Sequence, residues 1–183
     1  MKAVIASDIH GNSIYMDALE QVILKENPDK LILLGDYGFH NPDIINTLNK
    51  YSDIIYACRG NCDTDEFKDE VKFNYLRDYF ETNLDSTRFF CTHGHLLYQK
   101  EMIELSKDKY ILQGHTHVYR IHGKTINPGS VSRPRENPEP TCLVYKNKTF
   151  YLFDLYNNTI IDERALENEK KWKKRKKYSI IIV

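Results

Sequence analysis

The sequence lacks the cysteine spacing that is typical of a structural zinc site or a redox motif. Its four cysteines are Cys58, Cys62, Cys91 and Cys142, and no two of them form a Cys-x-x-Cys pair. Closely spaced cysteine pairs are what zinc ribbons and thioredoxin-like motifs share. We therefore expect free thiols rather than zinc ligands or disulfides, as is usual in a reducing compartment.

An excess of charge of one sign is also lacking, and so is any long apolar run. Lys plus Arg and Asp plus Glu number 26 each, so no overall basic field is available to hold a nucleic-acid polymer. The apolar run before Asp8 is only a few residues long, which is too short for a signal peptide or a membrane span. We expect a cytoplasmic protein with no transmembrane segment and no stable nucleic-acid partner.

The chain of 183 residues, 41% of them hydrophobic, has the size of one domain with a substantial core. No linker or repeat interrupts residues 1–165, which we predict to be that domain. Residues 166–183 form a basic tail, with seven Lys or Arg among residues 170–177. A solvated charge run is the usual interpretation of such a tail. Binding to a membrane surface or nucleic acid, or strand pairing in an oligomer, are the alternatives.

Apolar runs alternate with amphipathic segments in the first third of the chain. This pattern predicts strands at residues 2–7, 30–34 and 53–58, with helices at 12–25 and 42–51 between them. Such alternation is typical of a parallel sheet that is covered on both faces. A mostly antiparallel half is expected to follow, with strands at 79–83, 87–92, 110–113, 119–126, 141–145, 149–155 and 159–164 and a helix at 99–107.

Polar side chains follow five of these strands, at the edge where open α/β sheets bind ligands. They are Asp8, His10, Asp36, Asn61, Asp63, His93, His95, His115 and His117. A protein core has no use for so many polar groups at one edge, so we predict a metal site. Nitrogen and oxygen ligands without a thiolate pair suit Mn²⁺, Fe, Zn²⁺, Co²⁺ or Ni²⁺. Seven of these groups exceed the needs of one ion, which implies two ions and a bridging carboxylate, most naturally Asp36.

The order of these motifs resembles the calcineurin-like metallophosphoesterase superfamily. The motifs are D-x-H at 8–10, G-D at 35–36, G-N-x-D at 60–63, His93 and G-H-T-H at 114–117. Two further segments, THGH at 92–95 and NPGSVSRPR at 127–135, resemble its small YfcE-type phosphodiesterase branch. The resemblance covers residues 1 to about 165. It implies an α/β fold, a four-layer α/β/β/α sandwich of two mixed sheets.

The resemblance also implies the ligand sets and the reaction. Asp8, His10 and His117 would bind one ion, Asn61, His93 and His115 the other, and Asp36 would bridge them. Two divalent ions leave the site positively charged, which favours a phosphate anion. The expected activity is hydrolysis of a small phosphodiester by a metal-bridging hydroxide, with Mn²⁺ as the expected ion and a homodimer as a common assembly. A phosphomonoesterase is one alternative. Another is a metal-binding or metal-free scaffold, because a retromer subunit of this fold lacks some of the histidines.

Cys62 stands where many relatives have a histidine that assists the leaving group and is oriented by the following aspartate, here Asp63. A neutral thiol is a weak donor, so we expect a preference for good leaving groups. A thiolate formed beside the cations is the alternative. The predicted catalytic residues are Asn61, Cys62, Asp63 and His93.

Three more residues are predicted to contact the substrate. Arg59 and Arg133 could each bind a phosphate through two guanidinium nitrogens. His95 follows Gly94 in the same loop as His93 and could also reach the substrate. Ion pairs for the two arginines and a solvated loop position for His95 are the structural alternatives.

Overall fold

The computed structural model describes residues 1–136 and 139–166. Within these residues, strand β1 (Lys2–Ala6) lies inside a six-stranded sheet, here called the first sheet. The strand order is β11-β10-β9-β1-β2-β3. Strands β1, β2 (Lys30–Leu33) and β3 (Ile55–Ala57) are parallel. The antiparallel strands β9 (Thr141–Lys146), β10 (Thr149–Asp154) and β11 (Thr159–Ala165) extend the sheet on the other side of β1. The first sheet therefore contains strands from both the beginning and the end of the described chain.

The second sheet has the order β4-β5-β6-β8-β7. Its members are β4 (Tyr79–Leu84), β5 (Thr87–Thr92), β6 (Tyr110–Gln113), β7 (Tyr119–His122) and β8 (Thr125–Pro128). Two expectations differ from this arrangement. The strand predicted at 119–126 is a hairpin of β7 and β8, because Gly123 turns the chain with φ +60°. The second half is also less antiparallel than expected, since β5, β6 and β8 run parallel.

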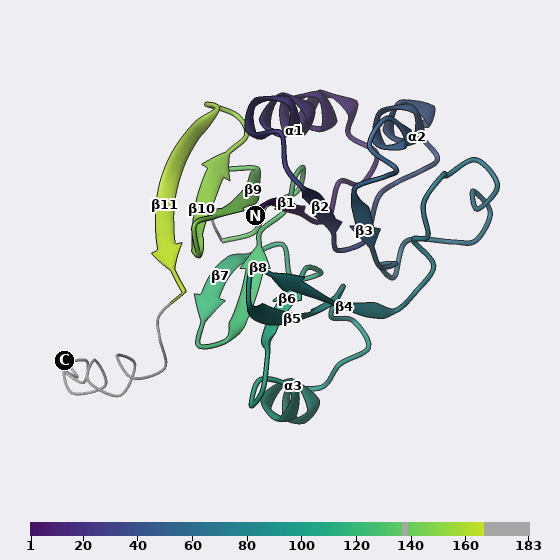
Figure 1. Ribbon diagram of the computed structural model, residues 1–183. Helices are drawn as coiled ribbons and strands as arrows, with labels where there is room; N and C mark the ends of the chain where they lie inside the picture. Colours follow the sequence, from purple (N-terminus) through teal and green to yellow (C-terminus); the bar gives the residue numbers. More distant parts are fainter. Residues whose placement is uncertain (137–138, 167–183) are drawn as a thin grey trace.

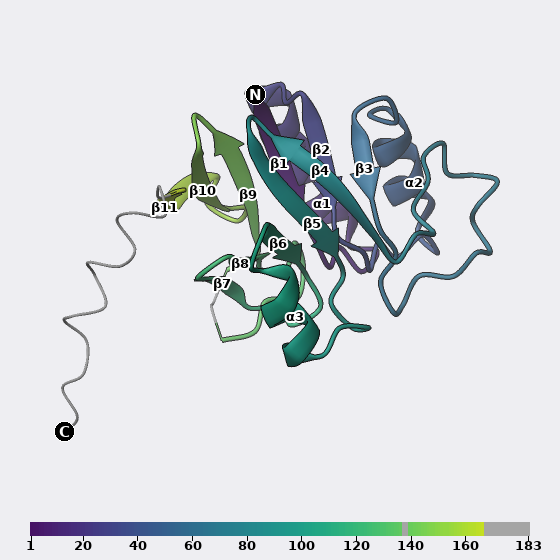
Figure 2. The same cartoon turned by 60° about the horizontal axis from the view of Figure 1, so that its bottom comes forward.

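In the described residues, three helices lie outside the two sheets (Figures 1 and 2). Helices α1 (Ser13–Glu26) and α2 (Pro42–Asn49) cover the outer face of the first sheet, and α3 (Gln99–Leu105) lies beyond the second sheet next to β6. Asn12 caps α1 by accepting a hydrogen bond from the Tyr15 N–H at 3.1 Å. The resulting layers, helix, sheet, sheet and helix, confirm the predicted four-layer α/β sandwich.

The alternation of side chains along β1 shows where the core lies. Val4 and Ala6 face the helices, whereas Ala3 and Ile5 face the second sheet, and all four are fully buried. Three cysteines, at 58, 91 and 142, are buried in these two apolar layers, and all four cysteines of the chain are free thiols as expected. Because β1 is packed on both faces, the loop that follows it has a fixed position.

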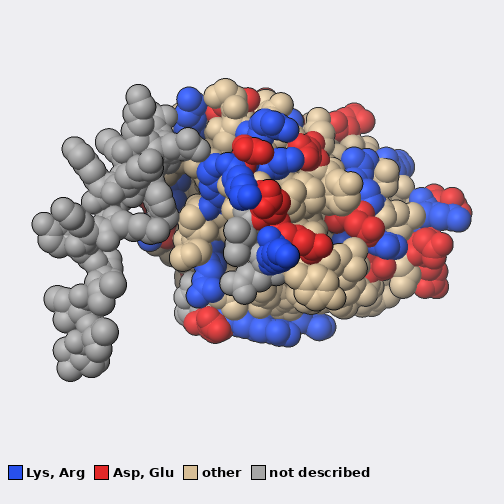
Figure 3. Space-filling model, turned by 90° about the horizontal axis from the view of Figure 1, so that it is seen from below, with Lys and Arg blue, Asp and Glu red and all other residues tan. Residues whose placement is uncertain are grey.

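The surface carries charges of both signs. Lys, Arg, Asp and Glu side chains are interspersed on the face seen from below (Figure 3). Ion pairs such as Lys109–Glu81 and Lys107–Glu104, at 2.5 and 2.6 Å, illustrate this mixing. None of the helices in the described ranges is both long and apolar enough to cross a membrane. Of the predicted basic tail, residues 167–183 lie outside the described residues.

Candidate metal centre

Five loops bring the predicted ligands to one edge of the two sheets. They follow β1, β2, β3, β5 and β6, and they carry Asp8 with His10, Asp36, Asn61, His93, and His115 with His117. Backbone hydrogen bonds tie the loops together. The Asp8 N–H donates to the Gly35 carbonyl at 3.0 Å, and the His10 N–H donates to the Asp36 carbonyl at 2.9 Å. The convergence predicted from the strand ends is therefore present.

A first group of side chains has ligand atoms that all lie within 4.8 Å of one another. Its members are Asp8, His10, Asp36 and His117. The Nε2 atoms of His10 and His117 are 3.2 Å apart, and Asp8 Oδ1 is 3.2 Å from Nε2 of His117. Asp8 is fully buried, and its Oδ1 atom has no hydrogen-bond partner among the described residues. A buried carboxylate oxygen without a partner is costly. A divalent cation would offset that cost, so this group fits a metal ion.

A second group surrounds His93 on the other side of Asp36. His93 Nε2 lies 3.2 Å from Asn61 Oδ1 and 3.5 Å from Asp36 Oδ2. The ring centroids of His93 and His115 are 5.0 Å apart. Asp36 Oδ2 is also 3.7 Å from His10 Nε2, so a single carboxylate oxygen lies between the two groups.

Hydrogen bonds set the tautomers of His93 and His117. Each ring places Nδ1 2.7 Å from a backbone carbonyl oxygen, that of Leu34 for His93 and that of Arg133 for His117. A carbonyl only accepts, so Nδ1 carries the proton and donates it in both bonds. The Nε2 lone pair is then directed into the site, as in metal-binding histidines whose second nitrogen is held by the protein.

The carboxylates and burial shift the pKa values of the histidines in opposite directions. The adjacent Asp8 carboxylate raises the pKa of His117 above 6.5. Burial lowers the pKa of His93, but Asp36 outweighs it and the net shift is upward. Burial lowers the pKa of His10. Burial also raises the pKa of Asp36, but the adjacent His93 ring outweighs it and holds the pKa well below its usual range. The negative charge of Asp36 is thus retained at neutral pH.

Backbone strain is concentrated at the predicted ligands. Five of them have positive φ angles: Asp8 (59°), His10 (48°), Asp36 (57°), His115 (68°) and His117 (60°). A residue with a side chain adopts this left-handed region at a cost of about 1–2 kcal/mol. Such strain persists only where surrounding contacts hold it, and it clusters at functional sites. Residue spacing in the sequence does not reveal it.

Asp63 holds two of the loops together. Its Oδ2 atom accepts hydrogen bonds from the N–H groups of Asp36 and Gly60, at 2.8 and 2.7 Å, and its Oδ1 atom accepts one from Tyr37 at 2.9 Å. The two loops touch so closely that a Cβ on Gly60 would collide with the Asp36 carboxylate. The sequence motif suggested that Asp63 orients residue 62. The three bonds make Asp63 a positioning residue for the loop of Asp36, and its role toward residue 62 stays a prediction.

The end of β8 and the segment after it support the ligands in a way that was not expected from the sequence. The Ser130 hydroxyl donates to the Asp8 carbonyl oxygen at 2.9 Å, and the Asn127 amide donates to the Gly114 carbonyl oxygen at 2.7 Å. Both side chains are buried. The sequence feature that pointed to this support was the NPGSVSRPR segment, but the spacing of its residues does not indicate which loops it contacts.

Cys62 lies at the exposed edge of the site. Its N–H donates to Asp36 Oδ1 at 2.9 Å, and its sulfur accepts a hydrogen bond from the Asn61 amide at 3.4 Å. Local desolvation and the nearby carboxylates, Asp36 foremost, raise the pKa of the thiol to about 11. In the protein without metal, this shift favours the thiol over the thiolate.

The predicted substrate-contacting residues have different surroundings. Arg59 forms an exposed ion pair with Asp78, Nε to Oδ1 at 2.7 Å, which is the structural alternative for this residue. His95 packs edge-on against His93, with ring centroids 5.3 Å apart. Its Nδ1 atom is buried and has no hydrogen-bond partner in the part of the chain that is described. The side chain of Arg133 is exposed.

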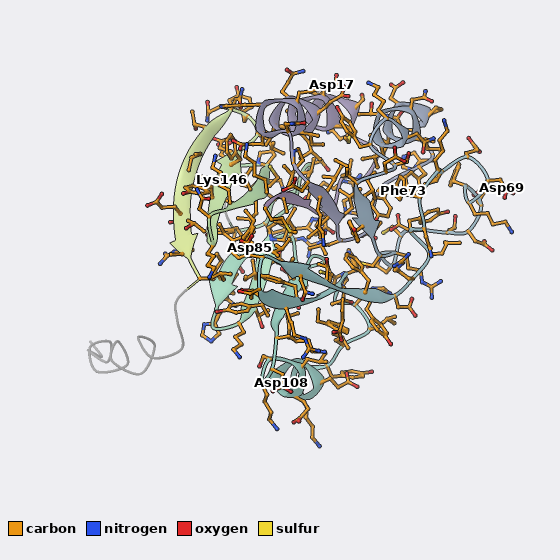
Figure 4. The ribbon with its side chains drawn as sticks, in the orientation of Figure 1. Asp17, Asp69, Phe73, Asp85, Asp108 and Lys146 are labelled. Carbon is orange, nitrogen blue, oxygen red and sulfur yellow. The ribbon has the colours of Figure 1, made fainter. Side chains whose placement is uncertain are left out.

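An aromatic cluster supports the loop of Asp36 from behind. Tyr37 stacks on Phe39 with ring centroids 4.8 Å apart, and Phe73 and Tyr75 pack edge-on against Tyr37. The Tyr37 hydroxyl donates to the Cys58 carbonyl oxygen at 2.6 Å. Phe73 lies beside β3, whereas Asp69 is at the outer tip of the same loop (Figure 4). The long loop between β3 and β4 therefore contributes to the core under the site.

A family model described as a calcineurin-like phosphoesterase superfamily domain matches residues 1–149. The chain belongs to this superfamily. This membership confirms the predicted family and, with it, the class of enzyme, a phosphoesterase. The ligand set described above suits the divalent metal use that the superfamily implies.

Named members of the calcineurin-like phosphoesterase superfamily match most of the chain. Phosphodiesterase YfcE of Escherichia coli strain K12 is 28% identical over 181 residues, which cover 91% of this chain and 98% of YfcE. Phosphodiesterase MJ0936 of Methanocaldococcus jannaschii is 29% identical over 141 residues, covering 70% of this chain and 83% of MJ0936. The similarity to YfcE confirms the branch that the motifs indicated.

Solved structures agree with the fold of this superfamily member. The structure of E. coli YfcE, described as a phosphoesterase, matches with a TM-score of 0.82 and 26% identity, over 91% of this chain and 100% of that chain. Vps29 of Entamoeba histolytica, solved with Zn²⁺, matches with a TM-score of 0.61 and 16% identity, over 90% of this chain and 98% of that chain. At that identity the likeness to Vps29 concerns the fold alone.

Proposed function

We propose that the chain is a phosphodiesterase that hydrolyses a small phosphodiester with two divalent metal ions. The observation that carries the proposal is the position of Asp36 Oδ2, which lies 3.7 Å from His10 Nε2 and 3.5 Å from His93 Nε2. One carboxylate oxygen between two groups of nitrogen and oxygen ligands suits a bridged pair of ions. The names of YfcE and MJ0936 support a diester as the substrate.

The two groups divide the ligands between the ions. Asp8, His10 and His117 would hold one ion and Asn61, His93 and His115 the other, with Asp36 shared between them. When bound, two divalent ions lower the pKa of a water molecule and offset the negative charge that builds up on the phosphate oxygens. We favour Mn²⁺, although these ligands also accept Zn²⁺, Fe, Co²⁺ or Ni²⁺.

The residues of the chain itself hold this arrangement and act on the leaving group. Hydrogen bonds at Nδ1 keep the Nε2 atoms of His93 and His117 directed inward. Asp63 fixes the loop of Asp36 through three backbone N–H groups. Cys62 is exposed at the edge of the site and would donate a weak hydrogen bond to the leaving oxygen. We therefore propose that esters with good leaving groups react fastest.

The test compares two p-nitrophenyl esters. Purified protein is stripped of metal, Mn²⁺ is restored, and release of nitrophenol is measured from the bis-p-nitrophenyl diester and from the monoester. His117→Ala serves as the variant that lacks one ligand. Mn²⁺-dependent turnover that favours the diester and is lost in His117→Ala is the expected result.

The other outcomes have definite meanings. Faster turnover of the monoester would establish a phosphomonoesterase instead. Binding of two Mn²⁺ per chain, measured by calorimetry, without turnover of either ester would favour the scaffold of the same fold. The cytoplasmic location and the homodimer expected from the sequence stay predictions.

A further inference from the structure

Two arginines flank Pro134 in a segment that is bonded to the first ligand group. The carbonyl oxygen of Arg133 accepts the Nδ1–H of His117 at 2.7 Å, and the N–H of Arg135 donates to the His117 carbonyl oxygen at 2.9 Å. The N–H of Arg133 also donates to the Ser130 hydroxyl at 2.8 Å. These bonds fix the backbone at both arginines relative to the metal centre.

Both arginines are bonded through their backbone to His117, so they lie beside the group formed by Asp8, His10 and His117.

Neither arginine has an acidic partner within 4 Å among the residues that the structure describes, and both side chains are exposed. Three other arginines of the described residues, Arg59, Arg88 and Arg164, form ion pairs. Arg59 contacts Asp78 at 2.7 Å, and Arg164 contacts Asp162 at 3.3 Å. Two unpaired guanidinium groups next to a centre that gathers divalent cations raise the local positive potential, which favours an additional anion.

The formal charges of the metal-loaded centre indicate how much further negative charge a substrate can bring to it. Two divalent ions carry about four positive charges, against the carboxylates of Asp8 and Asp36 and one hydroxide equivalent. A phosphodiester adds one further negative charge and brings the centre close to neutral. The charges of Arg133 and Arg135 are then left over, and they match the charge of one phosphate monoester group, about −1.5 to −2 at neutral pH. Arginine binds such a group through two nitrogens at once.

We propose that Arg133 and Arg135 bind a second phosphate on the substrate, carried by one arm of the phosphodiester that is hydrolysed. This inference rests on the proposed function. It defines the substrate class as small phosphodiesters with a terminal phosphate, such as a dinucleotide that is phosphorylated at its 5′ end. It also makes Arg135 a specificity-determining residue that neither the sequence motifs nor the ligand geometry indicated.

The first test measures binding and does not depend on turnover. Butylphosphonate and butane-1,4-diphosphonate differ only in the second anionic group, and neither has an ester bond that could be hydrolysed. Their dissociation constants are measured by calorimetry at pH 7.5 on the Mn²⁺-loaded protein. The diphosphonate is expected to bind about tenfold more tightly, and Arg133→Ala/Arg135→Ala should remove that difference. Arg120→Ala removes an exposed arginine of β7 and should keep it.

A lysine variant separates binding from folding. Arg133→Lys/Arg135→Lys keeps both charges but loses the paired nitrogens, so it should retain part of the preference, about two- to fivefold. Thermal melts of all variants check that the exposed substitutions leave the fold intact. Equal affinity of the wild-type protein for the two phosphonates would overturn the proposal, and so would an unchanged preference in the double alanine variant.

The second test uses turnover of a matched pair of dinucleotides. Thymidylyl-thymidine and its 5′-phosphorylated form contain the same phosphodiester. The ratio of their kcat/KM values should exceed about ten in the wild-type protein and fall towards one in the double alanine variant. Turnover of both dinucleotides at equal rates would refute the second-phosphate site while leaving the phosphodiesterase intact. Failure to turn over any diester, with the phosphonate preference present, would refute the proposed function alone.

Discussion

Asp63→Asn tests how the two loops of the metal centre are held. The carboxylate accepts three backbone N–H groups, from Asp36, Gly60 and Tyr37, at 2.7–2.9 Å. Asparagine has nearly the same shape, but it has one acceptor oxygen and no charge. If that oxygen keeps the bonds to Asp36 and Gly60, the amide group of asparagine must face the Tyr37 N–H, and two donors then meet.

The size of the effect follows from the bonds that change. A hydrogen bond to a charged group contributes about 1.5–3 kcal/mol, and an N–H left without a partner costs about 1–3 kcal/mol. Asp63 is half-buried, so solvent replaces part of what is lost. We expect a decrease in the free energy of unfolding of about 3 kcal/mol. For a chain of this size that corresponds to roughly 6–12 °C in Tm.

The assay combines a thermal melt with amide hydrogen exchange and Mn²⁺ calorimetry. In Asp63→Asn the amides of Asp36, Tyr37 and Gly60 should exchange faster, and Mn²⁺ should bind at least about tenfold more weakly, because the loop of Asp36 is no longer fixed. Asp65→Asn is the matched control, since its exposed carboxylate lies two residues away. A melt within about 2 °C of the wild type, with unchanged protection of these amides, would refute the reasoning.

Three further predictions follow from the same site. Gly60→Ala places a Cβ against the Asp36 carboxylate. We expect this variant to fold with a lowered Tm and to bind fewer Mn²⁺ ions in calorimetry. Full Mn²⁺ binding would contradict the close contact. The raised pKa values of His93 and His117 mean that their protonated forms stabilise the metal-free protein below pH about 6.5, and that this contribution is lost as pH rises through the folded-state pKa values. The increase in Tm on adding Mn²⁺ should therefore be larger at pH 8 than at pH 6, and an increase independent of pH would exclude these histidines as ligands. Cys62→His supplies a stronger hydrogen-bond donor. Hydrolysis of aryl diesters with poor leaving groups should therefore accelerate by about tenfold or more relative to that of diesters with good leaving groups. An unchanged dependence of the rate on the leaving group would show that residue 62 does not contact the leaving oxygen.

The strand ends could be located from the sequence because local patterns determine them. The predicted strands at 87–92 and 110–113 coincide with β5 and β6. Polar residues after buried strands must lie at a sheet edge, so the convergence of Asp8, Asp36 and His93 was predictable. The hairpin of β7 and β8 was not, because Gly123 lies within a stretch that otherwise alternates like one strand.

Tertiary contacts of the centre could not be predicted, because they depend on which loops meet. The positive φ of Asp8 and Asp36 does not follow from the spacing of the motifs. The three bonds of Asp63 join residues that are up to 27 positions apart. Ser130 reaches the carbonyl oxygen of Asp8 across 122 positions. Spacing within a motif contains no information on such partners.

The place of β1 inside the first sheet has a consequence for the order of folding. β1 precedes the other strands of the described chain, yet one of its two neighbours is β9, which begins only at Thr141. Closing so long a loop is slow because its entropy must be lost before the contact forms. The loop of Asp8 therefore becomes rigid only when nearly all of the described chain is present. Acquisition of Mn²⁺ during refolding should thus be among the last events, so metal uptake would report completion of the sheet.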